Sequence, residues 1–284
     1  MKKISVLFFG GLGNQLFQLA LAKTLKEKWI NSEVDFIDLT SYASVKREWA
    51  LDYLGEKAKK INKFDYFILK VKRFINQKLI RVGISKNFFN IFNEKQYNNL
   101  NSKKLKNNST IIDGYWQSEK FFFEIRTSIK KTYLDYRKNL KNIYEDSETV
   151  ALHIRLGDFV DFNSSRKEHF VCDFNWYLKA INYLYSKNNN LKFVIFTNDH
   201  FYLKEKFIFP SYINYYISKE KNEAHIDMLY MSFCNHFIIS NSSYSWWASY
   251  LGENENSIII APKYWYPNQL TVKLGIYRSN WILL

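Results

Sequence analysis

Short apolar runs alternate with amphipathic stretches along this 284-residue chain. The first 40 residues contain an apolar run at 4–9, a glycine-rich turn, apolar positions at helical spacing over 15–29 and a second apolar run at 34–39. A short continuous apolar run is typical of a buried strand, so this order predicts strand, loop, helix and strand. Such alternation is typical of parallel βαβ units.

The same alternation returns after residue 110. Predicted strands occupy 110–112, 149–154, 193–196, 236–239 and 257–261. Predicted helices occupy 175–185, 225–233 and 243–251. We therefore expect an α/β protein of two Rossmann-like domains, with a break near 138–148 and domain limits of 1–142 and 143–284.

The segment 62–92 does not fit this alternation. Its apolar residues, among them Phe64, Phe67 and Phe74, recur at helical spacing, while lysines and arginines occupy other positions. Two interpretations stay open: a basic amphipathic helix that lies flat on anionic lipid, or a helix whose apolar side packs on the domain and whose lysines are solvated.

Composition narrows the class of protein. The chain is 47% hydrophobic and 19% aromatic, which excludes disorder as the dominant state. Its net charge is +14, and the segment 56–108 holds 14 Lys or Arg against three acids, which is +11 of that total. Such an excess favours an anionic partner: nucleic acid, a membrane surface or a phosphorylated substrate.

The cellular setting is expected to be the cytoplasm. Two cysteines, Cys172 and Cys234, are too few for a disulfide framework. The first apolar run is too short for a signal peptide, and no stretch approaches the ~20 apolar residues of a membrane span.

Three motifs carry candidate chemistry. The turn Gly10-Gly11-Leu12-Gly13-Asn14-Gln15 lies between a predicted strand and helix, where backbone N–H groups can meet a phosphate or a sugar hydroxyl. Neither the dinucleotide fingerprint nor the P-loop pattern is present, so ligand loop and simple tight turn both stay open.

The second motif is His153-Ile154-Arg155 at the end of the predicted strand 149–154. His153 and Arg155 are two residues apart and therefore share a face. An arginine fork binds diphosphate oxygens bidentately, and an imidazole beside it can add a hydrogen bond. Asp158 could hold the guanidinium, and a purely structural Arg–Asp pair is the alternative.

The third motif is Ser240-Asn241-Ser242-Ser243, which follows a predicted strand and precedes a helix. Its hydroxyl and N–H groups could hold a second phosphate, or the motif could be an ordinary N-cap. Upstream, Asp227 could accept two N–H bonds from a guanine edge, or simply stabilise a helix start. Asp-x-Asp, HExxH and CxxC patterns are missing from the sequence, which favours a metal-free diphosphate site.

The segments 10–18, 153–158 and 240–247 together resemble the bacterial α-1,2-fucosyltransferases of glycosyltransferase family 11. Segments 113–118, 197–199 and 228–236 agree with the family, and the matches run in order from residue 10 to 262. The resemblance implies a GT-B fold with a cleft between two domains. It also implies inverting, metal-independent transfer of L-fucose from GDP-fucose in α-1,2 linkage to a galactose-ending oligosaccharide, in O-antigen synthesis.

The resemblance also implies roles for individual residues. Arg155 would neutralise the departing phosphates, and His153 would contact the diphosphate or the fucose. The implied donor-binding residues are Gly11, Gly13, Asn14, Asp158, Asn198, Asp199, Asp227, Asn241, Ser242 and Ser243. No cofactor or metal beyond the donor substrate is implied. A lipid-linked acceptor would place the enzyme on the inner face of the cytoplasmic membrane, with the segment 62–92 on anionic lipid.

One departure from the family pattern concerns donor choice. The family's usual second arginine is replaced by Leu156, which by alternation faces packing with Ile154. A different GDP-sugar or linkage is therefore an alternative. Asp158, Asp113 and Glu119 are candidates for the catalytic base, and the sequence does not choose among them. A non-catalytic basic module for membrane or nucleic acid is a further alternative, although no RNA-binding signature is present and nucleic acid is not an expected partner.

Overall fold

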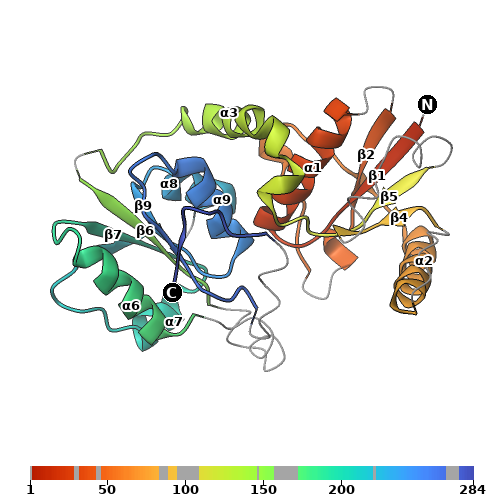
Figure 1. The fold of residues 1–284 in the computed structure, drawn as a ribbon. Coiled ribbons are helices and arrows are strands. Elements are labelled where there is room, and N and C mark those ends of the chain that lie inside the picture. The colour runs from red at the N-terminus through yellow and green to blue at the C-terminus, as the bar shows by residue number, and fades with distance from the viewer. Residues whose placement is uncertain are drawn as a thin grey trace. The chain divides into compact units, whose positions relative to one another are not determined.

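The computed structural model (Figure 1) describes residues 2–28, 32–42, 46–82, 89–94, 109–145, 147–156, 172–219, 222–266 and 275–284. The chain forms two compact units, Met1–Ile129 and Lys130–Leu284, whereas the sequence placed the boundary at 142/143. The division falls inside helix α3 (Arg126–Arg137). The later part of α3 packs on the second unit, where the Tyr133 ring lies 5.5 Å from that of Trp247.

Unit 1 is built on a five-stranded sheet in the order β3-β2-β1-β5-β4. The strands are β1 (Lys2–Phe8), β2 (Ser32–Asp38), β3 (Lys59–Lys60), β4 (Ile91–Phe92) and β5 (Thr110–Ile112). All pairings are parallel. Helices α1 (Leu12–Lys28) and α2 (Lys63–Arg81) flank the sheet (Figure 1). Short 3-10 turns occupy Thr40–Tyr42, Asp52–Leu54, Glu119–Phe121 and Phe123–Ile125.

Unit 2 is built on a six-stranded parallel sheet in the order β11-β10-β9-β6-β7-β8. The strands are β6 (Thr149–Ile154), β7 (Lys192–Thr197), β8 (Asn214–Ile217), β9 (His236–Ile238), β10 (Ile259–Ala261) and β11 (Ile282–Leu283). The helices are α6 (Phe174–Tyr185), α7 (His200–Lys206), α8 (Ala224–Met231) and α9 (Ser243–Gly252). Strand β6 is buried along its whole length, which makes it the centre of the core.

The predicted α/β class with parallel sheets is confirmed. Strands β5 and β6 have the bounds that the apolar runs predicted. Helix α1 begins at Leu12 rather than at residue 15, because the Gly11 carbonyl accepts the N–H groups of Asn14 (3.0 Å) and Gln15 (3.1 Å) and so opens the first turn earlier. Strand β8 was not predicted, because this half-exposed strand at the sheet edge lacks a continuous apolar run.

The buried side of helix α2 decides between the two interpretations of the segment 62–92. Leu69 and Asn76 are its buried residues, and Leu69 packs with Leu7 and Leu39. The phenylalanines face solvent instead, with Phe64 72% and Phe74 60% exposed. The interpretation in which the apolar side packs on the domain is therefore wrong.

No helix in the described part of the chain is both long enough and apolar enough to cross a bilayer.

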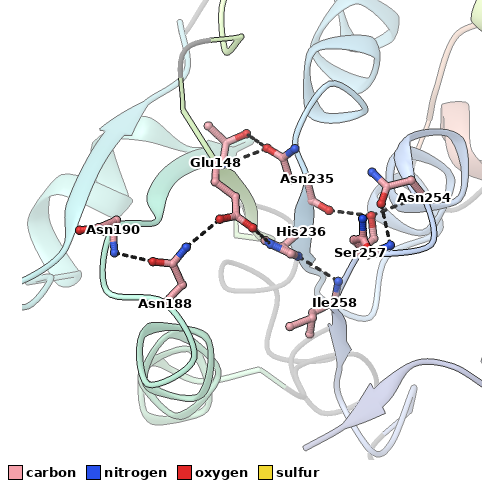
Figure 2. A network of polar contacts seen from close by, with 10 residues as sticks. Glu148, Asn188, Asn190, Asn235, His236, Asn254, Ser257 and Ile258 are labelled. Carbon is pink, nitrogen blue, oxygen red and sulfur yellow. Dashed lines mark hydrogen bonds and ion pairs between the residues drawn. The ribbon is translucent and has the colours of Figure 1, made fainter.

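The amino ends of the unit 2 strands are joined by a polar network (Figure 2). His236 Nδ1 accepts the Ile258 N–H at 3.0 Å, so Nε2 carries the proton and donates to Glu148 Oε1 at 2.8 Å. The second Glu148 oxygen accepts from Asn188 Nδ2 at 2.7 Å. Because these residues lie at the starts of β6, β7, β9 and β10, the network fixes one edge of the sheet.

Asn235 makes the most buried contacts of this network. Its Oδ1 accepts both the Thr149 N–H (2.8 Å) and the Thr149 hydroxyl (3.1 Å), and Thr149 is fully buried.

Replacement of Asn235 by Ala would leave these donors without that acceptor, at a cost of about 1–3 kcal/mol. We expect faster amide hydrogen exchange in β6, measured by mass spectrometry. The control is Asn190→Ala, since exposed Asn190 joins the network through its backbone N–H; equal exchange in the two variants would contradict the expectation.

Candidate functional site

Three neighbouring strands of unit 2 end together and bring the predicted motifs to one edge. Strand β6 lies between β9 and β7, with His153 opposite Phe196 and Leu152 opposite Ile238. In a parallel sheet these carboxyl ends meet at one edge, where α/β proteins bind their ligands. The candidate residues that follow the three strands are Arg155 after β6, Asn198 and Asp199 after β7, and Asn241, Ser242 and Ser243 after β9.

Asn198 fixes the backbone directly after Arg155. Its Oδ1 accepts the Leu156 N–H at 2.8 Å, and its Nδ2 donates to the Leu156 carbonyl at 3.0 Å. The Leu156 side chain is 2% exposed and belongs to the core with Ile154, as the sequence predicted. The chain at Arg155 is therefore held from both sides, by β6 and by Asn198.

His153 is buried and neutral. Its Nδ1 lies 2.9 Å from Ser240 Oγ, and its ring centroid lies 5.5 Å from that of Tyr244. Burial, helped by the positive charge of Arg155, lowers the His153 pKa to about 3. At neutral pH the imidazole can donate one hydrogen bond and accept another, but it brings no charge to a phosphate. The cationic residue at this strand end is therefore Arg155.

The start of α9 differs from an ordinary cap. Ser242 has the extended backbone of an N-cap residue, yet its side chain makes no capping hydrogen bond. Ser242, Ser243 and Tyr244 are all partly exposed. The first N–H groups of a helix have no partner within the helix and carry partial positive charge, so this turn can receive an anion beside β6.

Two other candidate residues make internal contacts. Asp199 caps α7 by accepting the Tyr202 N–H at 2.9 Å. The amide of Asn241 is buried and donates to the Trp265 carbonyl at 3.1 Å. Their implied roles toward a donor stay predictions. Asp158 lies outside the described residues.

Asp227 lies in the first turn of α8, beside a pair of tyrosines. Its Oδ1 accepts from Asn222 Nδ2 at 2.7 Å, and burial raises the pKa of its carboxyl. The Tyr216 hydroxyl donates to that of Tyr144 at 2.7 Å. Burial raises the pKa of both tyrosines, and the nearby charge of Asp227 adds to the rise.

The glycine turn of unit 1 follows β1. Gly10 has φ +82°, and a Cβ there would lie 2.5 Å from Asn14 Nδ2. Asn14 cannot move aside freely, because its Oδ1 accepts from Gln117 Nε2 at 2.7 Å. Gly11 has room for a side chain, with only Arg47 Nε at 4.0 Å. Gly10, which was not among the implied site residues, is therefore the position where the turn requires glycine, while Gly13 lies buried in the first turn of α1.

Two glutamines that the sequence reasoning missed hold this turn. Gln15 donates to the carbonyls of Gly10 and Glu48, both at 2.9 Å, and accepts the Ala50 N–H. Gln18 accepts the Phe9 N–H and donates to the Gly114 carbonyl, both at 3.1 Å. Both side chains are fully buried. Two glutamines on the apolar face of a predicted helix were the available signal, since buried amides need partners.

Two of the three candidates for a catalytic base, Asp113 and Glu119, lie within the described residues. Both carboxylate oxygens of Asp113 accept from the Arg73 guanidinium at 2.8 Å, so a proton-accepting role would compete with this ion pair. Glu119 begins a short 3-10 turn. Within the described residues, no three His, Cys, Asp or Glu side chains are grouped as metal ligands would be.

The steric demand at Gly10 can be tested against a matched glycine. Gly55 also has positive φ (+73°), but a Cβ there would meet nothing within 4 Å. Gly55→Ala should cost about 1–2 kcal/mol through its left-handed backbone alone. Gly10→Ala should cost about 1–3 kcal/mol more, because it adds the clash with Asn14. Urea unfolding midpoints measure both, and equal midpoints would contradict the clash.

The buried His153 predicts a pH dependence of stability. Its pKa is about 3 in the folded chain and about 6.5 in the unfolded chain. Below about pH 6.5 the unfolded state therefore binds a proton that the folded state does not, and stability falls as the pH falls. From about pH 7 to about pH 5 the wild type should lose about 2 kcal/mol more unfolding free energy than His153→Gln. Parallel pH profiles in urea titrations would argue against a buried neutral imidazole.

Comparison with known proteins adds the family. The family model described as "Glycosyl transferase family 11" matches residues 3–284. An α-1,2-colitosyltransferase of Escherichia coli is 28% identical over 291 residues, covering 96% of this chain and 96% of that protein. The E. coli O-antigen biosynthesis glycosyltransferase WbnK is 28% identical over 302 residues, covering 97% and 98%.

Among solved structures, the family 9 glycosyl transferase of Veillonella parvula DSM 2008 is similar with a TM-score of 0.47 and 14% identity, covering 100% of this chain and 86% of that one. Two successive parallel α/β units are what the GT-B class requires, so that part of the expectation is confirmed. Because the family model extends over nearly the whole chain, the chain belongs to glycosyl transferase family 11 and is a glycosyltransferase.

Proposed function

We propose that the chain transfers L-fucose, or a close relative of it, from a GDP-sugar to an oligosaccharide acceptor, with inversion and without a metal. The observation that carries this proposal is the carboxyl edge of the unit 2 sheet. There Arg155 follows a strand whose end is fixed by Asn198, and the neighbouring strand β9 leads into the start of α9, where the Ser242 side chain makes no capping hydrogen bond. This edge supplies positive charge for a diphosphate from fixed groups of the chain.

Fixed positive groups suit the transfer reaction. When the glycosidic bond to the donor phosphate breaks, negative charge grows on the departing diphosphate. Groups that are already oriented stabilise this growing charge more than they stabilise the intact donor. Arg155 and the first N–H groups of α9 would act in this way, with the hydroxyls of Ser242 and Ser243 as further donors. Such a site needs no metal to neutralise the leaving group.

The surroundings of Asp227 support a guanine base. A carboxylate can accept the two N–H groups on the edge of guanine, and aromatic rings favour contact with a flat base. Oδ1 of Asp227 already accepts from Asn222, but an ionised carboxylate has about four acceptor positions. Asp227 could therefore accept hydrogen bonds from guanine while it keeps the one from Asn222. Tyr144 and Tyr216 lie near this carboxylate.

Two donors have specific support. The motif resemblance favours GDP-fucose and transfer in α-1,2 linkage. The relative named as a colitosyltransferase favours GDP-colitose, whose sugar is fucose without the 3-hydroxyl. Leu156 stands next to Arg155, where the family has a second arginine. Because of this difference from the family, we keep both sugars as candidate donors. The name of WbnK supports an acceptor in O-antigen synthesis, for which we propose a galactose-ending oligosaccharide.

Calorimetric binding in EDTA tests the donor. We expect GDP, GDP-fucose or GDP-colitose to bind with Kd values in the micromolar range, and UDP-galactose to give no signal. Between the two sugars, the true donor should gain at least about tenfold over GDP alone, which corresponds to about 1.4 kcal/mol. A requirement for Mg²⁺ would contradict the metal-free site, and equal binding of UDP-galactose would contradict guanine recognition.

The Arg155→Ala variant tests whether Arg155 stabilises the departing diphosphate. Loss of one fixed charge at the leaving group should lower kcat by about 10²–10³-fold while the chain stays folded. Arg126→Ala is the matched control. Arg126 is exposed, and its guanidinium donates a hydrogen bond to the carbonyl of nearby Phe123. Normal turnover by Arg155→Ala, measured as GDP release with acceptor present, would refute the assignment.

A further inference from the structure

Helix α2 presents an apolar stripe to solvent along its length. Its members recur at intervals of three and four residues, so they lie on one side of the helix. Within the helix the stripe consists of Phe64, Phe67, Ile68, Val71, Phe74 and Ile75, and the C-cap residue Val82 continues it past the end of the helix. Phe64 is 72%, Phe67 59% and Val82 69% exposed, whereas large apolar side chains at a solvent surface normally occur singly. A continuous stripe of this kind indicates an interaction surface.

The opposite side of α2 is fastened to unit 1. Arg73 forms the bidentate ion pair with Asp113, and Asn76 Nδ2 donates to the Ile91 carbonyl at 3.2 Å. The Tyr66 ring stacks on that of Tyr42 with centroids 4.0 Å apart. Tyr66, Leu69, Arg73 and Asn76 also recur at intervals of three and four, so the fastened side lies opposite the stripe. The helix therefore cannot turn its apolar side inward without breaking these contacts.

The residues around the stripe are mostly basic, which favours an anionic partner. Asp65 is the sole acid within Lys63–Arg81, and the Asn62 side chain both caps the helix through the Asp65 N–H and donates to the Asp65 carboxylate. The six basic residues are Lys63, Lys70, Lys72, Arg73, Lys78 and Arg81. Except for Arg73, none belongs to the fastened contacts above, and Lys78 lies over the Phe74 ring at 5.5 Å from its centroid. Long basic side chains beside exposed phenylalanines can reach headgroup phosphates while the rings enter the interface.

We propose that α2 lies in the plane of an anionic phospholipid surface, with the apolar stripe in the interface and its lysines on the headgroups. A helix with an apolar stripe on one side, basic residues along it and a fastened opposite side has the form of an interfacial anchor. An acidic protein groove would need to match seven apolar side chains along nearly the whole helix, whereas a fluid lipid surface adapts to them. The stripe belongs to unit 1 and includes none of the proposed donor residues, so the inference goes beyond the proposed function.

Vesicle co-sedimentation of the full chain tests the apolar stripe. The wild type should bind vesicles of phosphatidylglycerol and phosphatidylcholine, and bind pure phosphatidylcholine far less. The variant Phe67→Ser with Phe74→Ser should lose at least about tenfold in its partition coefficient. The control is Phe201→Ser with Ile208→Ser in unit 2, two residues that are 78% and 83% exposed; it should bind as the wild type does.

A second pair of variants tests the charges. Lys70, Lys72 and Lys78 are each changed to Gln, and Arg73 is left unchanged because it holds Asp113. Binding to the anionic vesicles should fall by about tenfold or more and lose most of its salt dependence. Three exposed lysines of unit 2, namely Lys179, Lys187 and Lys204, are changed to Gln as the matched control. Urea unfolding midpoints confirm that all variants are folded.

Three results would overturn the proposal. The first is unchanged vesicle binding by a folded stripe variant. The second is equal binding of the wild type to neutral and anionic vesicles, which would remove the role of the lysines. The third is a lipid-free dimer that becomes a monomer in the stripe variant, since the stripe would then be an interface between two copies of this chain.

Discussion

Parallel pairing puts the carboxyl ends of neighbouring strands along one edge of a sheet, and in each unit that edge carries the candidate chemistry. In unit 1 the ends of β1 and β5 bring the Gly10 turn together with Gly114 and Gln117. In unit 2 the ends of β9, β6 and β7 bring Ser240, Arg155 and Asn198 together. The opposite edge of the unit 2 sheet is joined by Glu148 and His236 (Figure 2), so structural and candidate functional polar groups are separated by the length of the strands.

Side-chain amides hold the loops at these edges. Gln15, Gln18 and Asn198 each use both the donor and the acceptor of one amide on main-chain groups. An amide can close a loop in this way because it offers both kinds of group on one short planar unit. None of these contacts adds a charge. The loops at these edges are therefore positioned by neutral groups, and Asn198 holds the backbone next to Arg155 without bringing a charge of its own.

The sequence predicted the parts that depend on local pattern. Buried runs such as β5 and β6 were correct to the residue, because a strand covered on both faces must be apolar throughout. The packing of Leu156 was correct because alternation carries past the strand end. The grouping of Arg155, Asn198 and Ser242 at one edge could be predicted as well, since parallel order follows from the βαβ alternation.

The remaining features depend on contacts between distant residues. Periodicity showed that α2 has an apolar side but could not show which side faces the sheet, because that is decided by Arg73 with Asp113 and by Leu69 with Leu7. Gln117 reaches Asn14 across 103 positions of the chain. Strand β8 depends on its pairing with β7 rather than on its own residues. Asp158, which the sequence offered as a partner for Arg155, lies outside the described residues.

The ion pair between Arg73 and Asp113 joins the outward-facing helix to the strand end that carries Gly114. If α2 rests on a bilayer, the carboxyl edge of the unit 1 sheet is held at a fixed height above the lipid, about one helix diameter or ~10 Å. A substrate at this edge would then be bound within about that distance of the lipid surface.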